Sequence, residues 1–430
     1  MISYDEMTKD ELKAEKERLL IEYKRYQELN LTLNMARGKP STEQLDLSMG
    51  MLDPIAHDEV IDSDSGMDVR NYGVLEGLRG AKELLAQMVS CKSESVIVCG
   101  NSSLNVMFDQ IARGFSFGYL GEKPWSKLDK VKWLCPVPGY DRHFAITEHF
   151  GFEMIPIPMS SDGPDMDLVE KYVQDPAVKG IWCVPKYSNP EGIVYSDEVV
   201  RRFARLKPAA RDFRIFWDNA YSIHYLYDEE ERRDHILDIL FECEKAGNPD
   251  LVFEFMSTSK ISFSGSGIAG VAASRANKED IISSMAVQTI GYDKVNQLRH
   301  IKFFKDLQGL NEHMKKHAAI LRPKFECVID TLEEELLPRG AGTFVRPRGG
   351  YFVSFRTVPG AAARVISLCF AAGLTLTSAG APFPYHKDPD DSVIRIAPSY
   401  PTLDELKQAM KIFAICVRLA TVELKLKDNN

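Results

Sequence analysis

Features typical of several protein classes are missing from this sequence. Its eight cysteines include no Cys-x-x-Cys pair, which argues against a zinc site and against a disulfide framework. No uninterrupted apolar run reaches about 18 residues, so we expect no membrane-spanning helix. The N-terminus opens with acidic and basic residues instead of a charged patch followed by an apolar core, so no secretory signal is visible. These absences predict a cytoplasmic protein with no membrane partner and no metal site.

The sequence also has fewer basic than acidic residues. The 53 Lys and Arg residues are outnumbered by 62 Asp and Glu residues, giving a formal net charge of -9. A nucleic-acid partner needs a basic face, so we expect none, although a few local arginines can still hold a small anionic substrate. At 430 residues the chain exceeds the usual single core, which predicts two domains. We place the larger domain at residues 51–305, and the smaller one at 306–430 together with an N-terminal helix and arm at 1–50.

Apolar runs predict the strands of an α/β fold. Candidate strands lie at residues 95–99, 131–135, 153–157, 180–185, 214–217, 251–256, 270–273, 349–355 and 392–397. The proline in the third run places that strand at a sheet edge. Capping boxes at Thr8 with Glu11 and at Thr402 with Glu405 predict helices that reach about residues 30 and 419. Helical spacing also continues from about residue 277 to 337.

Lys260 lies between two of these predicted strands, in a segment rich in serine and glycine at residues 257–270. A lysine buried at the end of a sheet is costly to desolvate as a cation. Burial should therefore lower its pKa and favour the neutral amine that attacks a carbonyl. The segment alone does not separate such a Schiff-base lysine from a solvated lysine in a flexible loop.

Two upstream motifs favour the chemical interpretation. Asp218-Asn219-Ala220-Tyr221 directly follows the apolar run at 214–217, and Asn189-Pro190-Glu191-Gly192 follows the run at 180–185. In open α/β sheets ligands bind beyond the carboxyl ends of the strands. We therefore expect Asn189, Asp218 and Lys260 to face one crevice.

Asn-Pro-x-Gly, Asp-x-x-Tyr and Ser-x-x-Lys, in this order and at these separations, resemble the fold type I pyridoxal-phosphate enzymes of the aspartate aminotransferase class. The phrases at residues 36–40, 100–103, 138–143 and 293–300 look like a divergent bacterial subgroup of these enzymes. The resemblance implies a large cofactor-binding domain with a mostly parallel seven-stranded sheet between helices, plus a smaller α/β domain. It also implies a homodimer with shared active sites.

The resemblance assigns the cofactor site residue by residue. Lys260 would carry pyridoxal 5'-phosphate, Asp218 would keep its pyridine nitrogen protonated, Asn189 and Tyr221 would bind its ring oxygen, and Tyr140 would stack on its ring. The phosphate would be bound by Asn101, Ser102, Ser103, Ser257, Ser259, Ser266, and Tyr72 of the other subunit. A helix beginning near Ser102 suits an anion on physical grounds as well. The family's usual phosphate-binding arginine is Ile268 here, so what replaces it is open.

The substrates implied are L-aspartate or L-glutamate as amino donor and 2-oxoglutarate or oxaloacetate as acceptor. Arg395 would bind the α-carboxylate as a two-pronged partner, and Gly38 would let the covering loop approach closely. For the second carboxylate we rank Arg37 and Lys294 first, because both are expected in loops near the cofactor. Arg142 and Arg299 are further candidates, and each of these four is also explicable as a solvated charge.

Other functions fit the same motifs. The fold alone does not fix the reaction, so a lyase or decarboxylase, or an aminotransferase for alanine or aromatic amino acids, remains an alternative. Aminotransferase-like domains also occur fused to DNA-binding modules, but the N-terminal region here is too short and too acidic for one.

Overall fold

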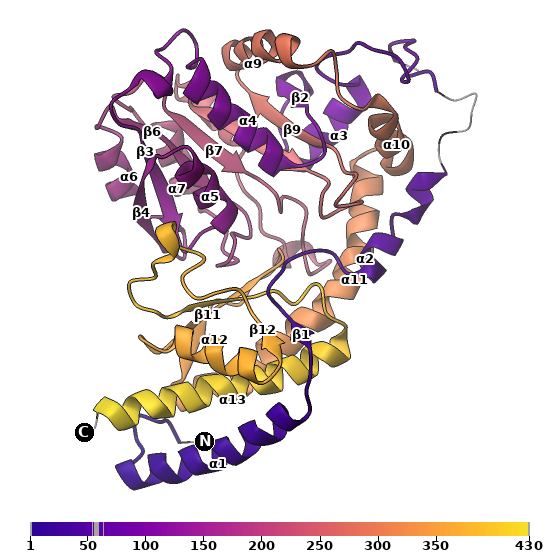
Figure 1. The fold of residues 1–430 in the computed structure, drawn as a ribbon. Coiled ribbons are helices and arrows are strands. Elements are labelled where there is room, and N and C mark those ends of the chain that lie inside the picture. The colour runs from indigo at the N-terminus through magenta and orange to yellow at the C-terminus, as the bar shows by residue number, and fades with distance from the viewer. Residues whose placement is uncertain (1, 54, 56–59, 63, 429–430) are drawn as a thin grey trace.

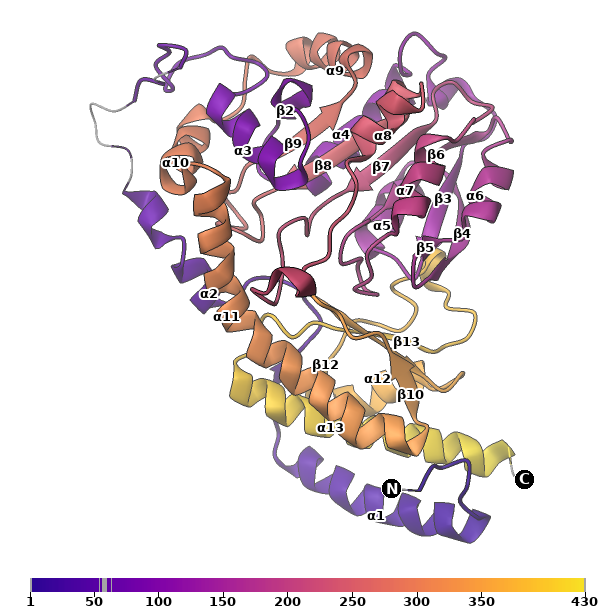
Figure 2. The same ribbon diagram turned by 180° about the vertical axis from the view of Figure 1, so that it is seen from behind.

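An eight-stranded sheet with strand order β2-β9-β8-β7-β6-β3-β4-β5 is the largest feature of the structure. The computed structural model describes residues 2–53, 55, 60–62 and 64–428 (Figures 1 and 2). The strands are β2 (Val96–Val98), β3 (Lys132–Val137), β4 (Glu153–Ser160), β5 (Gly163–Pro164), β6 (Val178–Cys183), β7 (Arg214–Asp218), β8 (Val252–Ser257) and β9 (Ala269–Ala273). The seven longer strands are the ones predicted, and the two-residue β5 adds an eighth at the edge.

Five neighbouring strands, β4, β3, β6, β7 and β8, are parallel, whereas β9 runs antiparallel to β8 and β2. Every residue of β6, β7 and β8 is buried, as expected for strands that are covered on both faces. This is why they appear in the sequence as unbroken apolar runs. The strand β4, expected at an edge, is followed only by β5, which pairs with it at Met159 and Ser160.

Helices cover both faces of this sheet (Figures 1 and 2). On one face α4 (Ser103–Ser116), α5 (Asp141–His149) and α9 (Arg275–Gln288) pack through residues such as Ile111, Phe144 and Ile281. On the other lie α3 (Arg79–Val89), α6 (Met166–Tyr172), α7 (Asp197–Ala204) and α8 (Ile239–Lys245). Because helices cover both faces, a ligand can approach this sheet only at the edge where the strands end.

A second layered region adjoins that edge. It contains the antiparallel sheet β10 (Gly342–Phe344), β11 (Val353–Thr357) and β13 (Val393–Ile396), the parallel pair β1 (Leu33–Asn34) and β12 (Leu374–Thr375), and helices α1 (Lys9–Glu28), α12 (Ala362–Ala371) and α13 (Leu403–Asp428). The long helix α11 (Leu307–Thr331) connects the two regions. The helices α2 (Thr42–Asp46) and α10 (Lys294–Phe304) pack along it (Figure 2). The domain boundaries at residues 50 and 305 stay a prediction.

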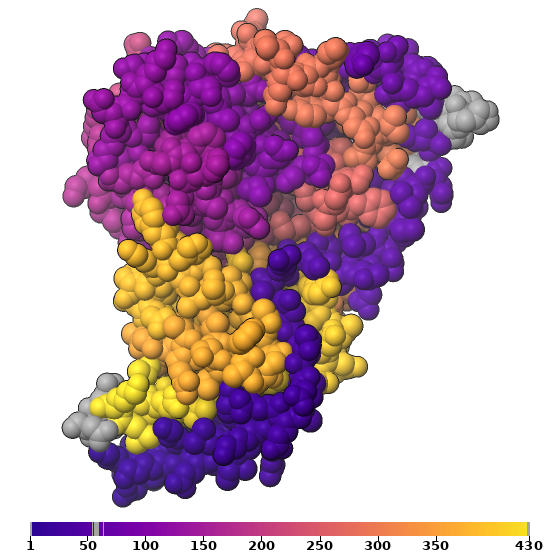
Figure 3. Space-filling model, viewed as in Figure 1, coloured from indigo at the N-terminus to yellow at the C-terminus, as the bar shows by residue number. Residues whose placement is uncertain are grey.

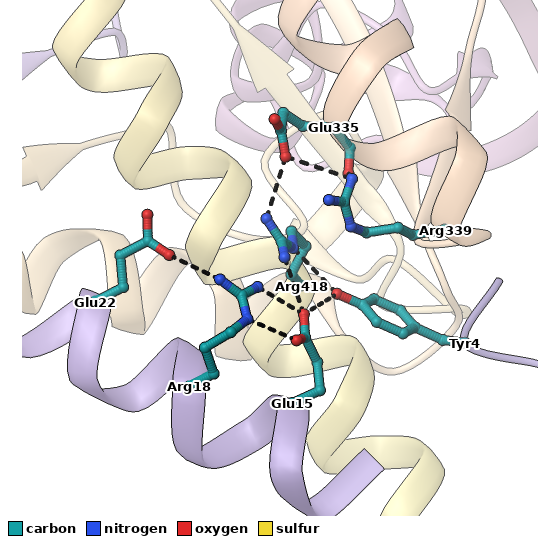
Figure 4. A network of polar contacts seen from close by, with 7 residues as sticks. All are labelled: Tyr4, Glu15, Arg18, Glu22, Glu335, Arg339 and Arg418. Carbon is teal, nitrogen blue, oxygen red and sulfur yellow. Dashed lines mark hydrogen bonds and ion pairs between the residues drawn. The ribbon is translucent and has the colours of Figure 1, made fainter. Parts of the chain in front are cut away.

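The two ends of the chain pack together as α1 and α13 (Figures 1 and 3). Figure 4 shows the polar network between them, centred on the buried Arg418, which donates to Glu15 Oε1 (2.9 Å), Tyr4 Oη (3.1 Å) and Glu335 Oε2 (3.1 Å). Burial alone would raise the pKa of Glu15, but hydrogen bonds from Arg18 and Arg418 outweigh it and lower the pKa to about 2. The helix α1 thus has a packing role within its own chain.

Both predicted capping boxes are confirmed, at Thr8 with Glu11 and at Thr402 with Glu405. The end of the last helix was predicted wrongly, because α13 continues to Asp428. Ala420 and Val422 stay buried beyond residue 419, and no glycine or proline interrupts the segment. In the described ranges no helix is long and apolar enough to cross a bilayer.

Candidate active site

A cavity of about 100 Å³ lies where the carboxyl ends of β6, β7 and β8 meet. Most of the predicted cofactor residues line it, namely Ser102, Ser103, Tyr140, Asn189, Asp218, Tyr221, Ser257, Ser259 and Lys260. They come from five separate segments of the chain, so the parallel strands and the loops after them create the site.

Lys260 lies three residues after the end of β8 and is only partly exposed. Its Nζ lies 4.8 Å from the ring centre of Tyr221 and 5.9 Å from that of Tyr351. Burial lowers the pKa of Lys260, and the charge of Asp218 only partly opposes this. Since none of the described residues accepts a hydrogen bond from this amine, it is available as a nucleophile or a base.

Asp218, the last residue of β7, has one occupied and one unoccupied carboxylate oxygen. His143 Nε2 lies 3.0 Å from Oδ2, while the buried Oδ1 has no hydrogen-bond partner among the residues that the structure describes. An unpaired buried carboxylate oxygen is costly unless a ligand supplies a donor. The protonated nitrogen of a pyridine ring would be such a donor, so this residue fits the cofactor that the sequence implies.

His143 is a site residue that the sequence analysis did not single out. Its ring stacks on Trp182 at 4.5 Å, with an interplanar angle of 13°. Tyr140 caps α5 and His143 lies three residues later, so both lie on one side of the helix start. The three-residue spacing from Tyr140 is the sequence signal that could have identified His143.

The helix α4 presents its N-terminus to the cavity. Ser102 is its N-cap residue, but the Ser102 side chain makes no capping hydrogen bond. The free N–H groups of a first helical turn, together with hydroxyls, form a natural phosphate site. Ser257 and Ser259 complete this wall, with their Oγ atoms 3.0 Å apart.

Three predicted phosphate residues are not part of the cavity lining. Asn101 donates to the carbonyl oxygen of Gly265 (3.3 Å), and the carbonyl oxygen of Ser266 accepts from Asn296. Tyr72 is 77% exposed and is not among the residues that line this cavity. Ile268 is buried in the core beside Met256 and Ile261, so this position offers no group to a phosphate.

Arg395, on β13 of the second region, contacts Asn189, which lines the cavity. Its Nη1 donates to Asp141 Oδ1 (2.8 Å) and Asn189 Oδ1 (3.4 Å), and its Nη2 donates to Thr377 Oγ1 (3.3 Å). The ring of Phe352 covers the guanidinium at 5.0 Å. A carboxylate bound here would lie next to Asn189, close to the reacting amine.

The loop that contains Gly38 passes close to the ring of Phe352. A Cβ on Gly38 would lie 2.3 Å from Phe352 Cζ, so only glycine fits there without displacing the ring. Arg37 beside it is exposed and lies in a loop. The placement of Lys294 in a loop was wrong: Lys294 is the first residue of α10, after the N-cap Asp293, and it is buried. The N-cap preference of aspartate was the overlooked signal.

Behind Lys260, a buried polar cluster holds the turn that carries it. The carbonyl oxygen of Ile261 accepts from His313 Nε2 (2.9 Å) and His317 Nε2 (3.0 Å), and Tyr351 donates to that of Lys260 (3.3 Å). Gln44 of α2 donates to both Tyr351 and His317 Nδ1. The Nε2 of His317 therefore carries its proton. The i, i+4 spacing of the two histidines was the available sequence signal.

Comparison with known proteins agrees with this geometry. The family model described as aspartate aminotransferase matches residues 7–429. The aspartate aminotransferase of Corynebacterium glutamicum is 45% identical over 395 residues, 92% of this chain and 90% of that protein. A crystal structure of an aspartate transaminase from the same organism superimposes with a TM-score of 0.95 at 42% identity, covering 98% of this chain and 99% of the other.

A more distant structure shares the fold alone. The α-aminoadipate aminotransferase LysN of Thermus thermophilus gives a TM-score of 0.69 at 18% identity, over 93% of this chain and 94% of the other. The central sheet, the long-range order of the motifs and these similarities lead to one assignment. This chain belongs to the aspartate aminotransferase family and is an aminotransferase of fold type I.

Proposed function

We propose that this protein is a pyridoxal-phosphate-dependent aspartate aminotransferase. The observation that carries the proposal is the pairing, on one cavity, of a lysine amine with a lowered pKa and a buried carboxylate oxygen without a partner. When bound, pyridoxal phosphate supplies an electron sink for the electrons released at the substrate Cα. Aspartate as substrate is supported by the name of the Corynebacterium glutamicum relative.

Each cavity residue has a distinct role toward that cofactor. Lys260 would attach it, Asp218 Oδ1 would keep its ring nitrogen protonated, and Tyr140 would pack on its ring face. Asn189 and Tyr221 would hydrogen-bond its ring oxygen. Its phosphate would be bound by the α4 N-terminus and by the cavity hydroxyls of Ser102, Ser103, Ser257 and Ser259, with Asn101 and Ser266 as more distant candidates.

The protein's own acid–base chemistry is assigned to Lys260. With pyridoxal phosphate bound, the free Lys260 amine would act as the general base that takes the proton from the substrate Cα, and then as the general acid that gives it back. Burial lowers the pKa of this amine and so favours the neutral form, which can accept that proton. Arg395 and Asn189 fix the α-carboxylate, so the Cα–H bond is oriented toward the lysine.

The second carboxylate of aspartate needs a cation that the α-carboxylate does not use. Arg37 is exposed in the loop beside Gly38, and no described carboxylate pairs with it. Lys294 is buried, and its Nζ lies near Gly291 and Gly73, again with no described carboxylate paired to it. Both remain candidates for this role.

The functional unit that we propose is a cytoplasmic homodimer with shared active sites. Tyr72 supports this, because a large aromatic side chain that is 77% exposed suits an interface and makes no side-chain hydrogen bond within its own chain. In the dimer it would reach the phosphate of the partner's cofactor. Sedimentation equilibrium should give twice the chain mass of 48.5 kDa, and a monomer would contradict this proposal.

A comparison of amino donors tests the proposed activity. Purified enzyme should convert 2-oxoglutarate to glutamate with aspartate as donor, with kcat/KM at least about tenfold above that for alanine or phenylalanine, because only aspartate offers a second carboxylate for a charge-assisted bond. Preference for alanine or an aromatic donor would contradict the aspartate assignment. Product formation from aspartate without any 2-oxo acid would instead indicate a lyase or decarboxylase.

A further inference from the structure

The guanidinium of Arg395 already has a carboxylate partner within its own chain. Its Nη1 is shared between Asp141 Oδ1 at 2.8 Å and Asn189 Oδ1 at 3.4 Å. The short, charge-assisted contact to Asp141 is the stronger of the two. A substrate carboxylate directed at Arg395 therefore meets a cation that another carboxylate has partly neutralised.

The two partners differ in their freedom to move. The Arg395 side chain is 8% exposed and is held by Asn189, Thr377 and the ring of Phe352. The Asp141 side chain is 27% exposed, lies in the first turn of α5, and makes no other side-chain hydrogen bond to the residues that the structure describes. The aspartate can turn toward water, whereas the arginine cannot.

Two carboxylates on one guanidinium would also repel each other. At separations of a few ångström in a partly buried site, like charges disfavour joint occupancy. Binding of a substrate carboxylate must then either displace Asp141 or be weakened by its charge.

We propose that Asp141 is an internal competitor for the substrate carboxylate, occupying Arg395 while the site is free and thereby setting the affinity for carboxylates. This inference rests on the proposed role of Arg395. It gives Asp141 a second effect, which is to keep Arg395 from binding small anions such as acetate between turnovers. Asp141 is thus a specificity-determining residue that acts through Arg395.

The substitution Asp141→Asn removes the charge and preserves the shape of the side chain. Succinate is a suitable probe, because it carries two carboxylates but has no amine and cannot be transaminated. Calorimetric titration of the holoenzyme with succinate should give a Kd about tenfold lower for Asp141→Asn than for the wild type, since a charge-assisted contact no longer competes. Acetate should also bind measurably more tightly.

Two controls separate this effect from a general change of charge or fold. Glu148→Gln also removes one negative charge, from an exposed residue of the same helix, and it should leave the succinate Kd unchanged. In an Arg395→Gln background, Asp141→Asn should no longer tighten binding, because the two residues act as a pair. Asp141→Ser gives a second variant should the asparagine form fold poorly.

An unchanged or higher Kd in folded Asp141→Asn and Asp141→Ser would overturn the proposal. Tighter binding that persists in the Arg395→Gln background would overturn it as well, because the effect would not pass through Arg395. These outcomes are independent of the aspartate assignment. A wild-type enzyme that fails to use aspartate would contradict the proposed function, yet the succinate shift could still be observed.

Discussion

Two residues at this site each have a buried polar atom with no hydrogen-bond partner among the residues that the structure describes. The Asp218 Oδ1 and Arg395 Nε atoms are both buried and unpaired. Leaving such a group unpaired costs roughly 1–3 kcal/mol, which a bound ligand with a matching donor or acceptor would recover. Asp218 Oδ1 lies on the cavity, and its need for a donor is consistent with a ligand bound there.

Gly38 shows how one residue without a side chain shapes the substrate side of the cavity. Gly38→Ala would push the new methyl group into the ring of Phe352, which in turn covers Arg395. Overpacking of this kind typically costs about 1–3 kcal/mol, so we expect the KM for aspartate to rise by roughly tenfold. Steady-state kinetics measures this. Phe352→Leu should partly restore binding in the double variant, and a Gly38→Ala enzyme with unchanged KM would refute the contact.

The positions of site residues were predictable from sequence where short motifs mark them. Asp218 ends a buried strand, Asn189 and Lys260 lie in loops that follow buried strands, and the ends of parallel strands meet at one edge. Asp141 and His313 were not predictable as partners of Arg395 and Ile261. Their contacts join segments 254 and 52 residues apart, and nothing in local spacing reveals such pairs.

Among the elements, α11 carries the most pH-sensitive structure. Burial lowers the pKa of His317 to about 3 and also lowers the pKa of His313. In the unfolded chain both regain a pKa near 6.5, so below this pH the unfolded state binds more protons than the folded state. The free energy of unfolding should therefore fall as the pH falls from 7 to 5, by about 2 kcal/mol for His317, and His313 adds to this loss in the same direction.

Urea unfolding at pH 7 and at pH 5 measures this loss. His317→Gln should reduce the difference between the two pH values by about 2 kcal/mol, because the residue no longer titrates. His149→Gln, at an exposed position, should leave the difference unchanged. If His317→Gln and the wild type lose the same free energy, the buried neutral histidine is not the cause.

Elements of ordinary length were predictable, and very short ones were not. The central strands are entirely buried, so their apolar runs identify them. The strands β1, β5 and β12 have two residues each, too few for any periodic pattern. Their existence depends on tertiary packing, such as the pairing of Leu33 with Leu374 across 341 positions.

At the scale of the whole molecule, the site lies where the two regions of the chain meet. Asn189 extends from the large sheet and Arg395 from the antiparallel sheet, and their side chains meet at 3.4 Å. Gln44, from the N-terminal arm, supports the turn of Lys260 through Tyr351 and His317. The sequence indicated the larger sheet and the catalytic lysine, but the closure of the second region over them depends on contacts across the full chain length.

All these elements position one lysine, Lys260, as the residue that we propose carries the cofactor. Lys186 is the most informative alternative, because it is also buried and burial lowers its pKa to about 8, yet its Nζ is engaged by the carbonyl oxygen of Ser222 at 2.7 Å. Borohydride reduction of the purified holoenzyme, followed by peptide mass spectrometry, identifies the lysine that carries the cofactor. We predict a pyridoxyl adduct on Lys260 alone, and none in Lys260→Ala. An adduct on Lys186, or one that survives in Lys260→Ala, would contradict the account.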